Sequence, residues 1–180
     1  MIQLVGLLWG MALVFAIIGY IRGLSRELIA MAGIILALFA LFQFDDVIRG
    51  TLLANVSNDQ KFLVQSVLFL AIVFFAYQTR TFTRREVSQR GDGRDTLQSS
   101  VLGGLIGFVN GYLIWGTLWY FMHINNYPLS PYISQPPANS PSAQAISTLP
   151  LYILAGGPGG TGNLLALAVI VLFIFVLIVI

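Results

Sequence analysis

Residues 18–28, IGYIRGLSREL, close one long apolar run and open the next. Three charged side chains, Arg22, Arg26 and Glu27, lie within six residues of this stretch. Because so short a connection allows only a tight turn, the pattern predicts that the two flanking runs form an antiparallel helical hairpin. Glu27 can relieve the repulsion between the arginines or lie at the positive N-terminal end of the second helix. Two interpretations stay open: a solvated turn that anchors the topology, or a contact site for a partner or a lipid headgroup.

The composition of the 180-residue chain indicates a membrane protein. Hydrophobic residues make up 57% of the chain and charged residues 9%, whereas about a quarter of the residues in a soluble domain are charged. So few charged residues cannot cover a water-facing surface, and the predicted fold class is an all-α integral membrane protein. The net charge of +2 arises from basic residues in short loops, which gives no indication of a nucleic-acid partner.

The residue types that build common active sites are scarce. The chain has no cysteine, which excludes disulfides and thiolate metal sites, and one histidine, His123, is too few for a histidine-built metal site. No acidic or basic residue is expected well inside a span, whereas coupled transporters need an intramembrane ionisable group or a broken helix. An enzyme needs a base and usually a nucleophile within reach of each other. We therefore predict no enzymatic activity and no catalytic, cofactor or metal site.

Five apolar runs approach the length that crosses a bilayer, about 17–25 residues. They are residues 2–21, 28–44, 62–77, 97–122 and 164–180. The first four form a predicted four-helix core over residues 1–122. An extracytoplasmic loop rich in proline and glycine follows at residues 123–163, and a C-terminal transmembrane helix is predicted at residues 164–180. Within the loop, the short apolar piece at residues 149–154 is expected to rest on the membrane surface.

Basic residues predict the orientation of these spans. Residues 79–96 carry five arginines, and with Arg22 and Arg26 they place seven of the nine Lys and Arg residues on one side of the membrane. The positive-inside rule assigns that side to the cytoplasm, with the N-terminus outside and the C-terminus cytoplasmic. The loop could also bind an anionic lipid or a phosphate ligand, but its composition favours a role in setting the topology. Its arginines are Arg80, Arg84, Arg85, Arg90 and Arg94.

Glycines spaced four residues apart predict where helices come close together. They occur in the first run and, as a longer ridge, in the run at residues 97–122. Small residues let two helix backbones approach in lipid, where van der Waals packing drives association. Asn110 lies beside the ridge, and we interpret it as a partner in an inter-helix hydrogen bond rather than as a substrate contact. The predicted helix-packing residues are Gly19, Gly23, Gly103, Gly107, Gly111 and Asn110.

Aromatic side chains gather near the outer end of the fourth run. Trp115, Trp119 and Tyr120 precede His123 there. Aromatic residues are enriched where a helix meets the membrane–water interface, so this group predicts an aromatic belt.

A short repeat links the first and fourth runs. Residues 18–23, IGYIRG, return in similar form as residues 106–111, IGFVNG. The repeat suggests two helical hairpins of related sequence, with Arg22 of the first copy replaced by Asn110 in the second.

Two longer stretches carry a family resemblance. Residues 21–33, IRGLSRELIAMAG, follow the first apolar run, and residues 101–114, VLGGLIGFVNGYLI, lie in the fourth. Together they resemble the colicin V production protein (CvpA) family, whose marks are an R-G-x-x-R-E turn and an L-G-x-x-x-G-x-x-x-G helix. The resemblance covers about residues 2–122. The turn falls on Arg22, Gly23, Arg26 and Glu27, and the helix mark falls on Leu102, Gly103, Gly107 and Gly111.

The resemblance implies an inner-membrane protein linked to colicin V production or export and to envelope maintenance. The chain departs from the family pattern in two places. The family commonly has arginine where this chain has Asn110, and the family core has four helices, without the proline-rich loop and the fifth span.

Three classes of function stay open. The first is a CvpA-like scaffold or envelope factor in the bacterial plasma membrane, and the second is an accessory subunit of a larger respiratory or photosynthetic membrane complex. A channel or transporter is the third. The partners expected for the first two classes are membrane lipids, other membrane-protein subunits or a second copy of the chain.

Overall fold

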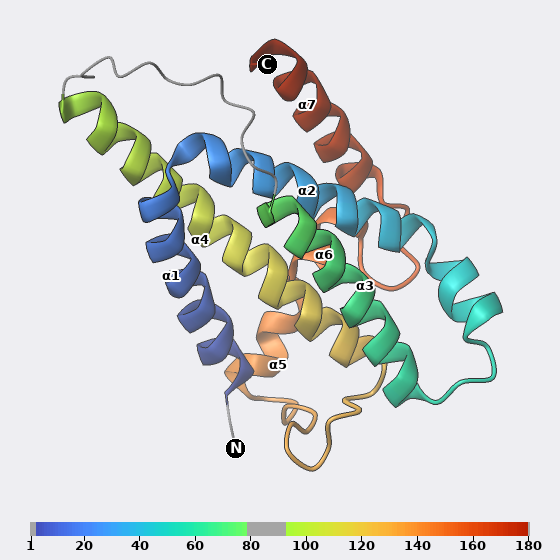
Figure 1. The fold of residues 1–180 in the computed structure, drawn as a ribbon. Helices are drawn as coiled ribbons and strands as arrows, with labels where there is room; N and C mark the ends of the chain where they lie inside the picture. Colours follow the sequence, from blue (N-terminus) through green and yellow to red (C-terminus); the bar gives the residue numbers. More distant parts are fainter. Residues whose placement is uncertain (1–2, 79–92, 180) are drawn as a thin grey trace.

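The computed structural model describes residues 3–78 and 93–179, and within these residues it contains helices and no strand (Figure 1). The longest helix, α4, lies at the centre, where it packs against α1, α2, α3 and α6. The terminal helix α7 lies at the edge, against α2 and α6. The elements are α1 (Leu4–Arg22), α2 (Leu24–Gln43), a π-helical segment η1 (Asp46–Leu52), α3 (Asn58–Gln78), α4 (Gly93–Ile124), α5 (Pro141–Ala145), a 3-10 turn η2 (Ile146–Thr148), α6 (Pro150–Ala155) and α7 (Asn163–Val179).

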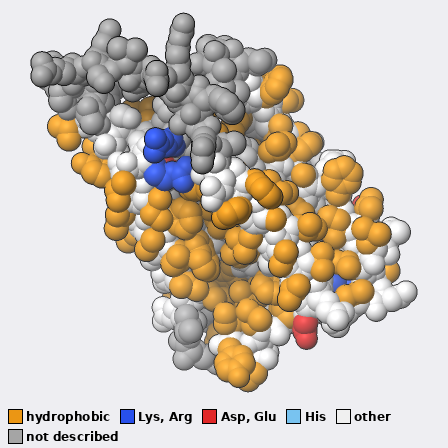
Figure 2. Space-filling view, in the orientation of Figure 1, with side chains coloured by type: hydrophobic (Ala, Val, Ile, Leu, Met, Phe, Trp, Pro, Cys, Tyr) orange, Lys and Arg blue, Asp and Glu red, His pale blue; other side chains and the backbone are white. Residues whose placement is uncertain are grey.

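Four of these helices, α1 to α4, are long and apolar enough to cross a membrane. They correspond to the first four predicted spans. Helix α7 is apolar throughout but has 17 residues, and much of its side-chain surface is exposed, with Leu167 54% and Ile170 55% accessible. Figure 2 shows that hydrophobic side chains cover most of the visible surface, with one small cluster of basic side chains. The chain is therefore a multi-pass membrane protein.

Helices α1 and α4 touch through their backbones. A Cβ atom built on Gly107 of α4 would lie 2.9 Å from the Cα of Gly19 in α1, and one built on Gly103 would lie 2.8 Å from the Cα of Gly23. Real side chains do not come that close, so the contact needs the absence of a Cβ on this face. Gly111 extends it, because its Cβ would lie 2.8 Å from the Cα of Ala12.

Gly23 alone joins α1 to α2, in the left-handed region of φ (81°) that favours glycine. From this junction the two helices diverge: α1 runs along α4, and α2 packs against α3 and α4 (Figure 1). The antiparallel hairpin predicted for the first two runs is therefore not a packed pair of helices, because α1 and α2 make few contacts with each other. Residues 18–23 end at the junction, whereas residues 106–111 lie within α4, so the two similar stretches occupy different places in the fold.

Helix α6 corrects the prediction that residues 149–154 rest on the membrane surface. Pro150 and Leu151 are buried, and α6 packs against α4. Gly116 of α4 provides the space, since a Cβ there would lie 2.8 Å from Cγ of the Pro150 ring. The extracytoplasmic loop predicted from the sequence thus returns into the bundle.

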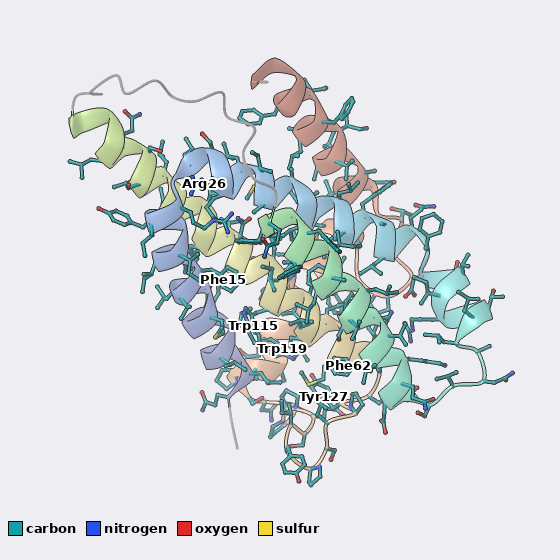
Figure 3. The ribbon with its side chains drawn as sticks, viewed as in Figure 1. Phe15, Arg26, Phe62, Trp115, Trp119 and Tyr127 are labelled. Atoms are coloured by element: carbon teal, nitrogen blue, oxygen red, sulfur yellow. The ribbon has the colours of Figure 1, made fainter. Side chains whose placement is uncertain are left out.

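The predicted aromatic belt is also largely inside the protein. Trp119 is 3% exposed and Tyr120 6% exposed. Figure 3 places Trp115 and Trp119 in the space between α1 and α3, and Tyr120 packs edge-on against Tyr152 of α6 at 5.6 Å between ring centroids. These side chains pack the end of the bundle, because α1, α3 and the returning loop cover them.

Candidate functional site

A glutamate lies fully buried where the first four helices approach one another. Glu27, in the first turn of α2, has no exposed side-chain surface. Its carboxylate oxygen Oε1 lies 2.9 Å from Nε of Arg22, the last residue of α1. Gly23 alone separates the two helices, and it turns the chain so that the first turn of α2 faces the end of α1. This turn brings the two side chains close together. The charges of the two side chains neutralise each other.

Two further side chains complete the coordination of the Glu27 carboxylate. The hydroxyl of Tyr77, near the end of α3, donates to Oε2 at 3.2 Å. The amide Nδ2 of Asn110, in the middle of α4, donates to the same oxygen at 2.9 Å and to the Glu27 carbonyl oxygen at 3.1 Å. Because only the nitrogen of this amide can donate to a carboxylate, Glu27 also fixes which way the Asn110 side chain faces.

Arg22 makes its remaining contacts with α3. Its guanidinium carbon lies 4.5 Å from the centroid of the Tyr77 ring, and its Nη2 donates to the Tyr77 carbonyl oxygen at 3.4 Å. A cation over an aromatic face is stabilised by the ring quadrupole, by more when it is partly removed from water. The cluster of Arg22, Glu27, Tyr77 and Asn110, which we call the buried polar cluster, thus takes one side chain from each of α1 to α4.

The interpretation of residues 22–27 as a solvated turn is wrong for Glu27. Glu27 lies in the first turn of α2, at the end of the predicted span, and is nevertheless buried. The reason is that helices α3 and α4 cover the junction, and Ser99 of α4 accepts the Leu24 backbone N–H at 3.4 Å. Arg26, by contrast, is exposed (Figure 3).

Of the predicted sites, the glycines lie in the part of the chain that the structure describes, whereas most of the arginine loop lies outside it. Gly19, Gly23 and the ridge glycines lie at the contact of α1 with α4, next to the buried polar cluster. The basic loop cannot be placed, because Arg80, Arg84, Arg85 and Arg90 lie outside the described residues, as does the side chain of Arg94.

A second polar network lies at the opposite end of the bundle. Gln65 of α3 donates through Nε2 to Oδ1 of Asp45 at 3.0 Å and accepts at Oε1 from Nδ2 of Asn125 at 2.9 Å. Burial raises the pKa of the Asp45 carboxyl above its ordinary value, and nearby Arg49 partly opposes the shift. The network ties the ends of α2 and α4 to the start of α3.

The contacts of the two networks are hydrogen bonds and ion pairs between helices. Among residues 3–78 and 93–179, no group of three or more His, Asp or Glu side chains could hold a metal ion. The Glu27 carboxylate accepts hydrogen bonds from Tyr77 and Asn110 at Oε2 and forms an ion pair with Arg22 at Oε1. What the buried polar cluster does is join four helices through hydrogen bonds that lipid cannot supply.

Sequence reasoning missed Tyr77 and misjudged Glu27. The useful signals were an acid five residues after an arginine across a glycine, and an asparagine amide in an apolar helix that needs a partner. No signal marked Tyr77, since a tyrosine at the end of a span is ordinarily an interfacial anchor.

Comparison with protein families adds one finding. The family described as Colicin V production protein matches residues 6–149. The comparisons with curated proteins and with solved structures found no match. The matched range contains α1 from Gly6 onward and all of α2 to α4, and therefore all members of the buried polar cluster.

Proposed function

Because the chain belongs to the colicin V production protein family, we propose that it is an inner-membrane scaffold for colicin V production or export and for envelope maintenance. In this role it acts through contacts with other membrane proteins or with a second copy of itself. The proposal assigns no enzymatic reaction to the chain.

The observation that carries the proposal is the engagement of the buried polar cluster. An ionisable group inside a membrane commonly marks a proton relay or an ion pathway. Here the carboxylate of Glu27 is held by Arg22, Tyr77 and Asn110, one from each neighbouring helix. Polar groups that hold helices together favour a fixed assembly over a moving one, which suits a scaffold.

The surface supports contacts within the membrane. Beyond its packing on α2 and α6, helix α7 leaves large hydrophobic side chains exposed, among them Leu164 and Phe173. Such a surface suits lipid or another transmembrane helix.

Purification of the full-length protein in mild detergent, followed by mass spectrometry of co-eluting proteins, tests the scaffold role. We expect a stoichiometric membrane-protein partner or a homo-oligomer. A monomer without partners, from cells that produce colicin V, would contradict the proposal. A partner set that carries redox or pigment cofactors would instead identify an accessory subunit of an energy-converting complex.

A second measurement tests the link to colicin V. Cells that lack this chain should release less colicin V activity, and the wild-type chain should restore it. The matched variants are Glu27→Gln, which disrupts the buried polar cluster, and Arg26→Gln, which removes an exposed charge one residue away. We expect failure of restoration with Glu27→Gln only; equal release with and without the wild-type chain would contradict the role.

A further inference from the structure

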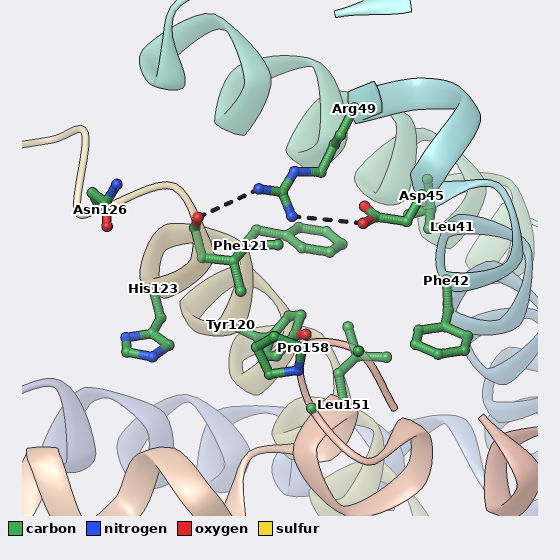
Figure 4. Close-up of a pocket in the computed structure, with 13 residues that line it drawn as sticks. Leu41, Phe42, Asp45, Arg49, Tyr120, Phe121, His123, Asn126, Leu151 and Pro158 are labelled. Carbon is green, nitrogen blue, oxygen red and sulfur yellow. Dashed lines mark hydrogen bonds and ion pairs between the residues drawn. The ribbon is translucent and has the colours of Figure 1, made fainter. Parts of the chain in front are cut away.

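A cavity of about 340 Å³ lies at the end of the bundle opposite to the buried polar cluster (Figure 4). It lies between the ends of α2 and α4, with α6 and the glycine-rich residues 157–159 forming another wall. Ligand pockets in proteins have volumes of about 300–1,000 Å³. The cavity is therefore large enough for a small molecule or a lipid headgroup.

The charged side chains of the cavity are Asp45 and Arg49, and their mutual contact is loose. Nη1 of Arg49 lies 3.6 Å from Oδ2 of Asp45, and its Nη2 reaches the Ile124 carbonyl oxygen at 3.5 Å. Strong guanidinium–carboxylate contacts are about 2.7–2.9 Å long and often bidentate. At 3.6 Å the contact of Nη1 with Asp45 is longer than a hydrogen bond, so this end of the guanidinium has donor capacity that a ligand can use.

Asp45 has one oxygen in a hydrogen bond and the other in the loose contact with Arg49. Oδ1 accepts from Gln65, while Oδ2 faces Arg49 across the loose contact. The two charged side chains are 36% and 30% exposed. At such exposure an ion pair contributes little to stability, so a ligand can separate the two charges at little cost.

The charges of the side chains around the cavity indicate which kind of ligand fits it. Asp45 and Arg49 carry opposite charges, and the His123 and Tyr120 side chains in the wall are ordinarily neutral at pH 7. A simple anion would be repelled by Asp45, and a simple cation by Arg49. A group that carries both charges matches both side chains.

The remaining wall and the location favour an amphiphile. Leu41, Phe42, Leu151 and Pro158 supply apolar surface beside the two charges. The cavity lies at the ends of two helices that cross the membrane, which is the level of lipid headgroups. A zwitterionic lipid presents both charges and apolar chains at this level.

We propose that this cavity binds a zwitterionic phosphate–ammonium group, with the phosphate on Arg49 and the ammonium on Asp45, as presented by the headgroup of phosphatidylethanolamine. The Asp45–Arg49 contact opens, and each charge then pairs with its complement on the ligand. A free molecule with the same group, phosphoethanolamine, shares this chemistry.

The test uses the full-length protein in detergent with equal amounts of phosphatidylethanolamine and phosphatidylglycerol, and native mass spectrometry counts the lipids retained. We expect the wild type to retain phosphatidylethanolamine in preference to phosphatidylglycerol. Arg49→Gln and Asp45→Asn should each weaken this retention about tenfold. Asp46→Asn is the matched control, because it removes the same charge from an exposed neighbour outside the cavity. Circular dichroism confirms that each variant keeps its helices.

A second arm measures thermal stabilisation of the same proteins by free phosphoethanolamine. Stabilisation of wild type and Asp46→Asn, but not of the two cavity variants, together with no lipid preference, would support the site with a soluble ligand. Absence of both responses in the wild type would overturn the proposal, and this comparison needs no variant to fold. Equal loss in Asp46→Asn and Asp45→Asn would overturn it as well.

Discussion

At the scale of single residues, Glu27 is a buried acid whose partners come from three other helices. A charged group in the interior is stable only when its partners are in place, and removal of one partner leaves the other uncompensated. Glu27 has such partners on α1, α3 and α4. Substitutions of Glu27 and of its partners should therefore lower the stability of the protein by different and predictable amounts.

Glu27→Gln leaves Arg22 without its counter-charge, and we expect a loss of about 3 kcal/mol in stability, the lower end of the range for a broken buried pair because Arg22 is partly exposed. Tyr77→Phe removes one hydrogen bond and should cost about 1 kcal/mol. Thermal unfolding in detergent, followed by fluorescence-detected size exclusion, measures both. A Tyr77→Phe effect as large as that of Glu27→Gln would contradict the central role of the ion pair.

Asp45 gives a pH-dependent prediction. Because burial raises the pKa of Asp45 above 3.8, folding favours its protonated form, and its contribution to stability is lost as pH rises through the raised pKa. Asp45→Asn resembles the protonated form. We therefore expect this variant to be more stable than the wild type at pH 7 and close to it near pH 3 when unfolding is followed across pH. An equal difference at both pH values would contradict the raised pKa.

The sequence marked three of the four residues of the buried polar cluster, but it did not predict that they would contact one another. Arg22 and Glu27 were marked by their charge, and Asn110 by its amide in an apolar helix. That Asn110 would reach Glu27 depends on how α1, α2 and α4 pack, and hydropathy carries no information on which helices are neighbours.

At the scale of elements, the contact of α1 with α4 depends on backbone proximity. The glycines on this face bring Gly19 and Gly107 so close that no Cβ fits between them. The spacing of the ridge predicted a close contact of this kind but not its partner helix. The loop helix α6 was misjudged for a related reason, since an apolar piece of six residues suits a membrane surface and a helix groove equally well.

Gly107→Ala should destabilise the protein by about 1–3 kcal/mol, because the added methyl group overpacks a backbone contact. Gly6→Ala is the matched control in α1, since a Cβ there meets nothing within 4 Å. We expect that control to be neutral or stabilising by up to about 1 kcal/mol through better helix propensity. Thermal unfolding of the two variants side by side gives the comparison; equal stability of both would rule out the tight contact.

At the scale of the whole molecule, the fold class followed from composition, and its membrane orientation rests on the distribution of arginines. Four apolar helices run along the bundle. The buried polar cluster lies at one end of the bundle, and the second polar network, which contains Asp45, lies at the other. By the positive-inside rule, we expect the first end to face the cytoplasm.

The absence of cysteine makes this orientation directly measurable. Ser25 and Asn139 are exposed near opposite ends of the bundle, so Ser25→Cys and Asn139→Cys place single thiols there. A membrane-impermeant maleimide applied to intact cells should label Asn139→Cys, and should label Ser25→Cys only after the inner membrane is permeabilised. The reverse pattern would invert the topology.

The short junction at Gly23 has a consequence for the order in which the chain is made. Arg22 and Glu27 lie five residues apart, so the ion pair joins two groups that are made one shortly after the other. We expect that this pair can form once the first turn of α2 is helical, before Tyr77 and Asn110 are synthesised. The growing chain would then present the insertion machinery with a paired charge, and the later helices would add the remaining hydrogen bonds.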